Sequence, residues 1–261
     1  MKYLRLYLLR MKYSFKILLN SMSNFIIGFL GFLFIQLSAI IFINITFSKI
    51  PTIEGYSFYQ IMTLYGFSQI SKGLDHFYSD YLWMLSVSSI ARGEYDKFMI
   101  RPVNTFFQVI IERVQFDAMG EIFVGILIYI YGIKGLGIPL SFRLIFLSIF
   151  FIVIGTIIYT ALKTIAASYA FKVKDSYFLL KAIYSFSEFT KYPIAVYPIF
   201  LQIALTYILA FAITANYPID ILLFGDNLSI YFKIITVTLV IVIIAIICWK
   251  KGEKAYESAG A

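Results

Sequence analysis

The sequence predicts an all-α integral membrane protein, and three observations support this fold class. Hydrophobic residues make up 61% of the chain and charged residues only 14%, whereas a soluble domain has about 25% charged residues. Residues 24–47 carry no charge, and a helix over them would span roughly 36 Å, enough to cross a hydrocarbon core of about 30 Å. Residues 2–16 carry five basic side chains and no acidic one, which favours a cytoplasmic N-terminus ahead of a first membrane helix.

The hydrophobic runs predict six membrane-spanning helices in a single domain of residues 1–261. Most of the 22 Lys and Arg residues fall in segments that this topology puts inside, in agreement with the positive-inside rule. Both termini are then expected inside. The predicted spans are residues 24–47, 57–72, 105–133, 142–168, 199–216 and 230–249.

The stretch after the second span has two possible structures. Apolar residues recur there at helical spacing, which indicates one helical stripe. Either the second helix is long and has a polar lower half, or a separate amphipathic helix lies under the membrane from Leu74 to Ile90. The stripe consists of Leu74, Phe77, Tyr78, Tyr81 and Leu85.

The third span begins as a polar helix with Glu112, Arg113, Asp117 and Glu121. Arg113 and Asp117 are four residues apart and are expected to pair on one helix face. Acidic residues at membrane depth are candidates for a proton or cation path. The alternative is a cytoplasmic helix end stabilised by this internal ion pair.

The segment before the fifth span is basic and is interrupted by Tyr192-Pro193 and Tyr197-Pro198. Proline removes a backbone donor and disfavours helix in the residue before it. We therefore expect residues 172–191 to lie at the inner surface.

Several function classes have no support in the sequence. The chain has one His and one Cys, too few for a His/Cys zinc site, and no phosphate-binding loop or nucleophile elbow. No catalytic residue, metal or cofactor is therefore expected. A nucleic-acid partner is not expected either, because the basic residues flank apolar spans and match the positive-inside pattern.

The inner turn after the second span carries a compact group of charges. Gly93 allows a sharp turn, and Pro102 suits the first turn of the helix that follows. This turn is either a surface for a cytoplasmic partner or an ordinary solvated loop. Its candidate residues are Gly93, Glu94, Asp96, Lys97, Arg101 and Pro102.

These residues carry a family resemblance. The pattern Gly-x-x-Asp-x-x-apolar-x-Arg-Pro from Gly93 to Pro102 resembles the ABC-2 superfamily of ABC exporter permeases, and more narrowly its six-span branch. A second stretch is similar as well, with Phe189, Tyr192-Pro193, Tyr197-Pro198 and Tyr217-Pro218 in order. The chain departs from the family at Tyr95, where an aliphatic residue is favoured. It departs again at Ala210, where a proline often interrupts the fifth span, so we expect a straighter fifth helix.

The resemblance implies a permease subunit of an ATP-driven exporter in a bacterial or archaeal cytoplasmic membrane. Such permeases pair as homo- or heterodimers, contact membrane lipid and bind separate ATPase subunits, so this chain itself is not expected to be an enzyme. Residues 1–20 would form an amphipathic elbow helix. A cytoplasmic coupling helix between spans two and three would dock on the ATPase through Glu94, Asp96, Lys97 and Arg101, with Gly93 and Pro102 shaping the turn.

Two other functions stay open from the residues. One is a membrane scaffold or assembly protein without transport activity. The other is a proton-coupled secondary carrier that uses Glu112, Asp117 and Glu121.

Overall fold

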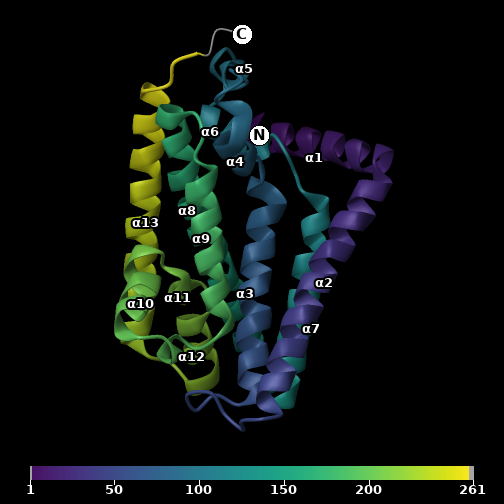
Figure 1. Ribbon diagram of the computed structural model, residues 1–261, viewed down its shortest axis with the longest axis vertical. Coiled ribbons are helices and arrows are strands. Elements are labelled where there is room, and N and C mark those ends of the chain that lie inside the picture. Colours follow the sequence, from purple (N-terminus) through teal and green to yellow (C-terminus); the bar gives the residue numbers. More distant parts are fainter. Residues whose placement is uncertain (1, 259–261) are drawn as a thin grey trace.

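The structure, a computed structural model, describes residues 2–258, so that residue 1 of the predicted elbow and residues 259–261 of the predicted domain lie outside the described range. The described chain is a bundle of helices without a strand (Figure 1). The first and last described residues both lie at the end drawn uppermost in Figure 1, which we call the upper end.

The described helices have the following bounds: α1 Lys2–Asn20, α2 Met22–Phe47, α3 Phe58–Ser79, α4 Tyr81–Met84, the π-helix η1 Leu85–Ser89, α5 Asp96–Met99, α6 Thr105–Ile111, the 3₁₀ helix η2 Phe116–Ala118, α7 Met119–Gly135, α8 Phe142–Val173, α9 Tyr177–Ser187, the 3₁₀ helices η3 Glu188–Lys191 and η4 Ile194–Val196, α10 Ile199–Ile203, the π-helix η5 Ala204–Ile208, α11 Phe211–Thr214, α12 Asn216–Phe224 and α13 Leu228–Lys254.

Four helices of the described range are long and apolar enough to cross a membrane. These are Met22–Phe47, Phe116–Gly135, Phe142–Val173 and Leu228–Lys254. A shorter apolar helix covers Ile199–Ile208. Length and composition thus support a membrane protein with at least four spans.

The centre of the bundle is built from α3, α7 and α8, and small residues let α3 and α7 approach closely. A Cβ added at Gly66 would lie 2.4 Å from the backbone nitrogen of Tyr129, and one added at Gly132 would lie 2.3 Å from the hydroxyl of Thr63. Glycine at such positions is a common device for packing helices in membranes.

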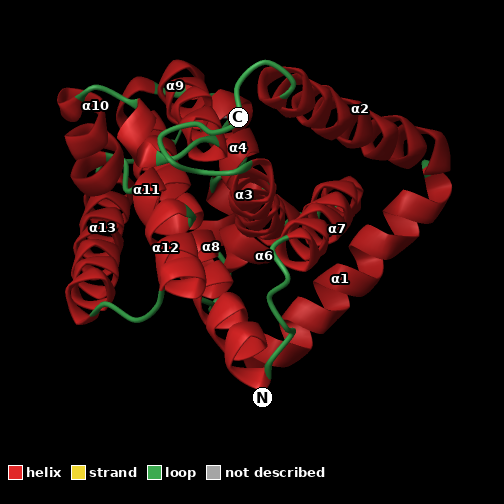
Figure 2. Ribbon diagram, turned by 90° about the horizontal axis from the view of Figure 1, so that it is seen from below, coloured by secondary structure: helices red, strands yellow, loops and turns green. Residues whose placement is uncertain are grey.

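Helix α1 runs across the upper end, and the chain bends near Ser21 into α2 (Figure 1). Seen from below, α1 and α2 lie on one side of the molecule and α13 on the opposite side (Figure 2). Only Gln36 and Ile43 of α2 are buried. The Gln36 amide donates to Gln69 over 2.9 Å, and its carbonyl oxygen accepts from Tyr65 over 2.6 Å. These hydrogen bonds join α2 to α3, although most other residues of α2 face outward.

The second helix follows the long-helix alternative. Leu74 lies inside α3, and the chain continues past Asp80 into α4 and η1. Tyr81 and Leu85 of the apolar stripe are buried in the protein. These two residues therefore pack against neighbouring helices and do not face a membrane surface.

The third span is not the continuous helix that the sequence suggested. Helix α6 ends at Ile111, and residues 113–115 leave the helical conformation before η2 and α7. The break is stabilised by the backbone N–H of Gln115, which donates to the carbonyl of Phe77 over 2.9 Å. The predicted Arg113–Asp117 pair is wrong for the same reason, since the break turns Arg113 toward Asp80, 3.3 Å away.

The segment of residues 172–191, which we expected at the inner surface, begins at the end of α8 with the exposed Lys172 and Lys174. Helix α9 then runs antiparallel to α3, and its contacts descend along α3 in order. The contacts are a ring contact of Tyr177 with Trp83 at 5.9 Å, stacking of Tyr184 on His76 at 5.2 Å, an ion pair of Glu188 with Lys72 at 2.9 Å and the Lys191 ammonium over the Tyr65 ring at 5.9 Å. Burial against α3, together with neutralisation by Glu188, accounts for this path.

The expectation of a straighter fifth helix is also wrong. Ala210 is fully buried and has a φ of 54°, in the left-handed region. A residue in the left-handed conformation commonly ends a helix, and here it separates η5 from α11.

Candidate functional site at the upper turn

The candidate site is the turn between η1 and α6, at the top of the molecule (Figure 1). Gly93 is buried and has a φ of 69°, a conformation that glycine adopts without steric cost. The N–H of Asp96 donates to the carbonyl of Gly93 over 3.2 Å, and α5 starts at Asp96. Gly93 thus shapes the turn as predicted from its residue type.

Aromatic residues anchor the turn to the rest of the bundle. Tyr95 and Phe98 are fully buried. The Tyr95 ring packs edge-on against Phe171 of α8 at 4.8 Å, and its hydroxyl donates to Glu253 of α13 over 2.8 Å. Glu253 also accepts from Thr105 at the start of α6. The turn is therefore fixed to both α8 and α13.

Asp96 is held by residues that follow α13. Its two carboxylate oxygens accept from the hydroxyls of Tyr256, at 2.8 Å, and Ser258, at 2.6 Å. The hydrogen bonds from Ser258 and then Tyr256 hold the pKa of Asp96 below its usual value. The carboxylate that the sequence offered to a partner thus already binds residues of its own chain.

Lys97 belongs to a chain of ion pairs that joins three helices. Its ammonium lies 3.0 Å from Glu112 at the end of α6, and the other oxygen of Glu112 lies 2.6 Å from the guanidinium of Arg10 on α1. The Glu112 side chain is only 13% exposed, so these contacts are better shielded than surface pairs. They connect α5 to the helix that crosses the upper end.

The tip of the turn is apolar, although the sequence pattern pointed to its charged residues. Ile100 is 83% exposed and Met99 53% exposed, and the exposed Arg101 follows them. The available signal was the Phe98-Met99-Ile100 run inside the charged group. Pro102 was expected in the first turn of the following helix, but it lies two residues before Asn104, the N-cap of α6, and so outside that turn. Glu94 lies 3.9 Å from Arg92 at the edge of the turn.

The second predicted polar group divides into two places. Glu112, Arg113 and Asp117 line one cleft of about 490 Å³ beside the bend between α1 and α2. Glu121 lies apart from them, with its carboxylate 2.7 Å from Nδ1 of His76 and only 3% of its surface exposed. The structure thus brings three of the four residues together.

A buried ion pair of Asp75 and Lys163 was not singled out from the sequence. Its two charged groups lie 2.8 Å apart, between α3 and α8, with no exposed side-chain surface. The sequence does indicate Lys163, since it is the one charged residue between Arg143 and Lys172. An ionisable residue inside an apolar span is a candidate functional residue.

Comparison with known proteins identifies the family. No curated protein and no solved structure matches the chain. A family model described as ABC-2 family transporter protein matches residues 32–260, nearly the whole chain and all of the upper turn. The all-helical fold with its long apolar helices agrees with this match. The chain therefore belongs to the ABC-2 family of transporter membrane proteins, the permease components of ABC transporters.

Proposed function

We propose that this chain is the permease subunit of an ATP-driven exporter, that it pairs with a second copy or a paralogue, and that its upper turn docks on a cytoplasmic ATPase. The observation that supports the docking role is the exposure of apolar residues at the tip of the turn. Ile100 and Met99 project from a base that is buried and hydrogen-bonded to α13. An exposed apolar pair on a rigid base fits a groove in a partner protein.

In this proposal the chain crosses the membrane six times, and its path supports that number. Besides the four long apolar helices, the chain returns to the upper end through α3, which has 22 residues and turns most of its polar side chains inward. It also passes from the end of α8 back to the start of α13, and α9 covers the upper part of that path beside α3 (Figure 1). In this proposal α9 begins the fifth crossing, and α10–α12 complete it at the lower end.

The charge distribution supports a cytoplasmic upper end. Basic residues of α1 lie there, and Lys250, Lys251 and Lys254 stand at the end of α13. Such an excess of Lys and Arg marks the cytoplasmic side of membrane proteins. The predicted localisation is the cytoplasmic membrane with both termini inside, and α1 then lies along the inner leaflet as an elbow helix.

The contacts of the turn give a route for coupling. Movement of the ATPase against Ile100 would displace α5 as a rigid piece, because Tyr95 and Phe98 fill its base. Two connections leave this piece, one through Tyr95 and Glu253 to α13, the other through Lys97 and Glu112 to α1. In this proposal the ATPase subunit holds the nucleotide, and these two connections transmit its movement to α13 and α1.

The proposal is tested by co-purification from membranes of the native host with the Ile100→Asp variant. A charge at the tip should weaken recovery of the ATPase about tenfold or more, as expected for loss of a buried apolar anchor worth roughly 1.5–3 kcal/mol. Ile50→Asp is the matched control, since Ile50 is exposed in the loop at the opposite end. Unchanged recovery with Ile100→Asp would overturn the docking role. Absence of any ATPase from cross-linked wild-type protein would overturn the exporter function.

A further inference from the structure

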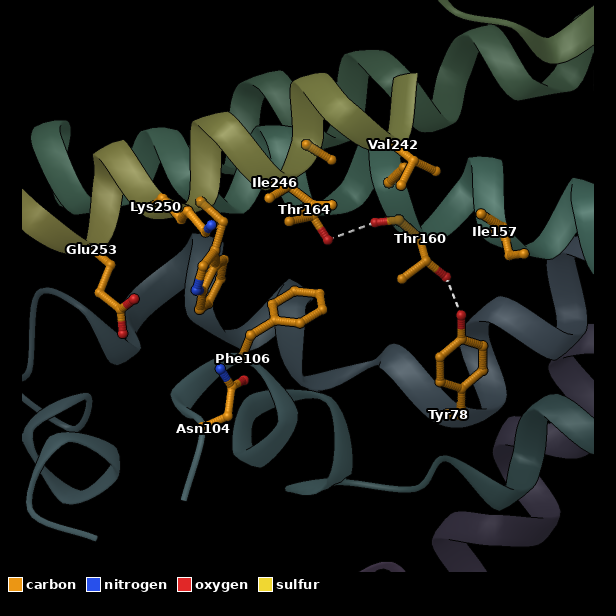
Figure 3. Close-up of a pocket in the computed structure, with 13 residues that line it drawn as sticks. Tyr78, Asn104, Phe106, Ile157, Thr160, Thr164, Val242, Ile246, Lys250 and Glu253 are labelled. Atoms are coloured by element: carbon orange, nitrogen blue, oxygen red, sulfur yellow. Dashed lines mark hydrogen bonds between the residues drawn. The ribbon is translucent and has the colours of Figure 1, made fainter. Parts of the chain in front are cut away.

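A cleft of about 440 Å³ lies at the upper part of the bundle, between α8 and α13 (Figure 3). Phe106 of α6 and Tyr78 of α3 close its inner side. It is separate from the docking tip and from the cleft beside α1. Its volume is within the range of small-molecule and lipid sites, about 300–1,000 Å³.

The lining changes from apolar to polar along the axis of the bundle. Figure 3 shows Ile157 and Val242 at one end of the cleft, and Asn104, Lys250 and Glu253 at the other. From Val242 to Lys250 the cleft follows α13 for about 12 Å. The polar end is the end of α13 that we propose to be cytoplasmic. This order matches a lipid of the inner leaflet, whose headgroup lies at the surface and whose acyl chain points inward.

The deeper wall presents hydrocarbon and satisfied hydroxyl groups. The Thr164 hydroxyl donates to the carbonyl of Thr160 over 2.7 Å. The Thr160 hydroxyl donates to Asp75 over 2.7 Å and also bonds to Tyr78. Because these hydroxyls already have hydrogen-bond partners, they do not require a polar ligand. An acyl chain beside them would leave no hydroxyl without a partner.

The mouth of the cleft carries an unpaired ammonium. Lys250 is exposed and has no ion-pair partner within residues 2–258. The neighbouring carboxylate, Glu253, keeps its charge but accepts hydrogen bonds from the hydroxyls of Tyr95 and Thr105 and forms no ion pair with Lys250. The indole N–H of Trp249, which lines the cleft, has no acceptor in the described part of the chain. A free ammonium here favours an anionic headgroup.

We propose that this cleft binds one anionic glycerophospholipid of the inner leaflet, with an acyl chain between α8 and α13 and its phosphate at Lys250. The proposal rests on the proposed function only for the orientation of the bundle. The bound lipid would brace Phe106, and through it the helix that follows the docking turn.

The test uses the fluorescence of Trp249. The chain has two tryptophans, so Trp83→Phe leaves Trp249 as the only one. This variant is reconstituted in phosphatidylcholine nanodiscs that contain an equal small fraction of either dibrominated phosphatidylglycerol or dibrominated phosphatidylcholine. Bromine quenches indole only at short range. We expect several-fold stronger quenching by the brominated phosphatidylglycerol.

Two further variants identify the site. Lys250→Gln should abolish the preference for phosphatidylglycerol, whereas Lys254→Gln, a matched control outside the cleft, should keep it. Ala245→Phe should reduce quenching by both lipids because the new ring fills the cleft. If Ala245→Phe fails to fold, the loss or retention of the phosphatidylglycerol preference in Lys250→Gln decides the proposal alone.

Three outcomes would overturn the proposal. Equal quenching by the two lipids means general lipid contact, and quenching no stronger than for free tryptophan in the bilayer means that no lipid enters. A disulfide-linked dimer formed by Ile246→Cys in a Cys248→Ser background means that a second copy covers the cleft. None of these readouts involves the ATPase, so failure here leaves the exporter function to its own test.

Discussion

The ammonium of Lys163 and the carboxylate of Asp75 lie 2.8 Å apart with no exposed surface on either side chain. The carboxylate also accepts from Thr160, Ser79 and Tyr184, the last over 2.6 Å from α9. Three helices therefore meet at one charge pair. Within a low-dielectric interior such a pair is stable only because both partners are present and hydrogen-bonded.

Removing one partner of this pair should destabilise the protein strongly. Lys163→Met leaves the Asp75 carboxylate buried without its counter-charge, and we expect a loss of about 3–5 kcal/mol in the free energy of unfolding. Unfolding by SDS or heat in nanodiscs measures it. The double variant Asp75→Leu, Lys163→Met should lose less than the single one. Lys172→Met, exposed on the same helix, should change stability by less than about 0.5 kcal/mol.

The contact of α3 with α7 should not tolerate a methyl group at Gly132. A Cβ there would lie 2.3 Å from the Thr63 hydroxyl and 2.7 Å from its backbone nitrogen. Gly132→Ala should therefore cost about 1–3 kcal/mol of stability through overpacking. Gly31→Ala is the control, because nothing lies within 4 Å of that position. Equal stabilities for the two variants would contradict the close approach.

The bend at Ala210 predicts opposite signs for two alanine-to-glycine substitutions. With a φ of 54°, Ala210→Gly relieves a left-handed conformation and should raise stability by roughly 1 kcal/mol. Ala212→Gly, in the right-handed α11, should lower it by a similar amount. A loss at both positions would mean that residue 210 is not left-handed.

The contact of Asp96 with the residues after α13 should depend on pH. The hydroxyls of Ser258 and Tyr256 lower the pKa of Asp96 from its ordinary value of 3.8. The contact therefore favours the ionised carboxylate: its contribution is complete above pH 3.8 and is lost as the pH falls through the lower pKa of the folded state. Carbon-13 NMR of labelled aspartate carboxyls measures this pKa. The Tyr256→Phe, Ser258→Ala double variant should return it toward 3.8, and an unchanged pKa would contradict the contact.

Local patterns predicted much of the fold. The charge-free run of residues 24–47 anticipated α2, and the basic amphipathic segment anticipated α1. Gly93 was recognised because glycine adopts a positive φ without steric cost, and Gly93 has a φ of 69°. These features depend on spacing along the chain, which a single sequence displays directly.

The misjudged features depend on distant neighbours. Arg113 was assigned to Asp117 because they are close in sequence, but its partner Asp80 comes from another helix. The basic residues before the fifth span suggested a surface segment, and Lys172, Lys174 and Lys181 are exposed. Lys191 differs from them, because it pairs with Glu188 beside α3. The left-handed conformation of Ala210 could not be predicted from its residue type, because alanine does not favour it. The buried environment imposes that conformation.

The contacts that fix the upper turn have a consequence for biosynthesis. Tyr95 and Asp96 leave the ribosome early, but Glu253 and Tyr256, to which they bond, are synthesised more than 150 residues later. The turn therefore reaches its final shape only after α13 has been inserted. An unfinished or mis-inserted chain would present an incompletely formed turn. Under the docking role proposed above, the ATPase would then assemble selectively with finished molecules.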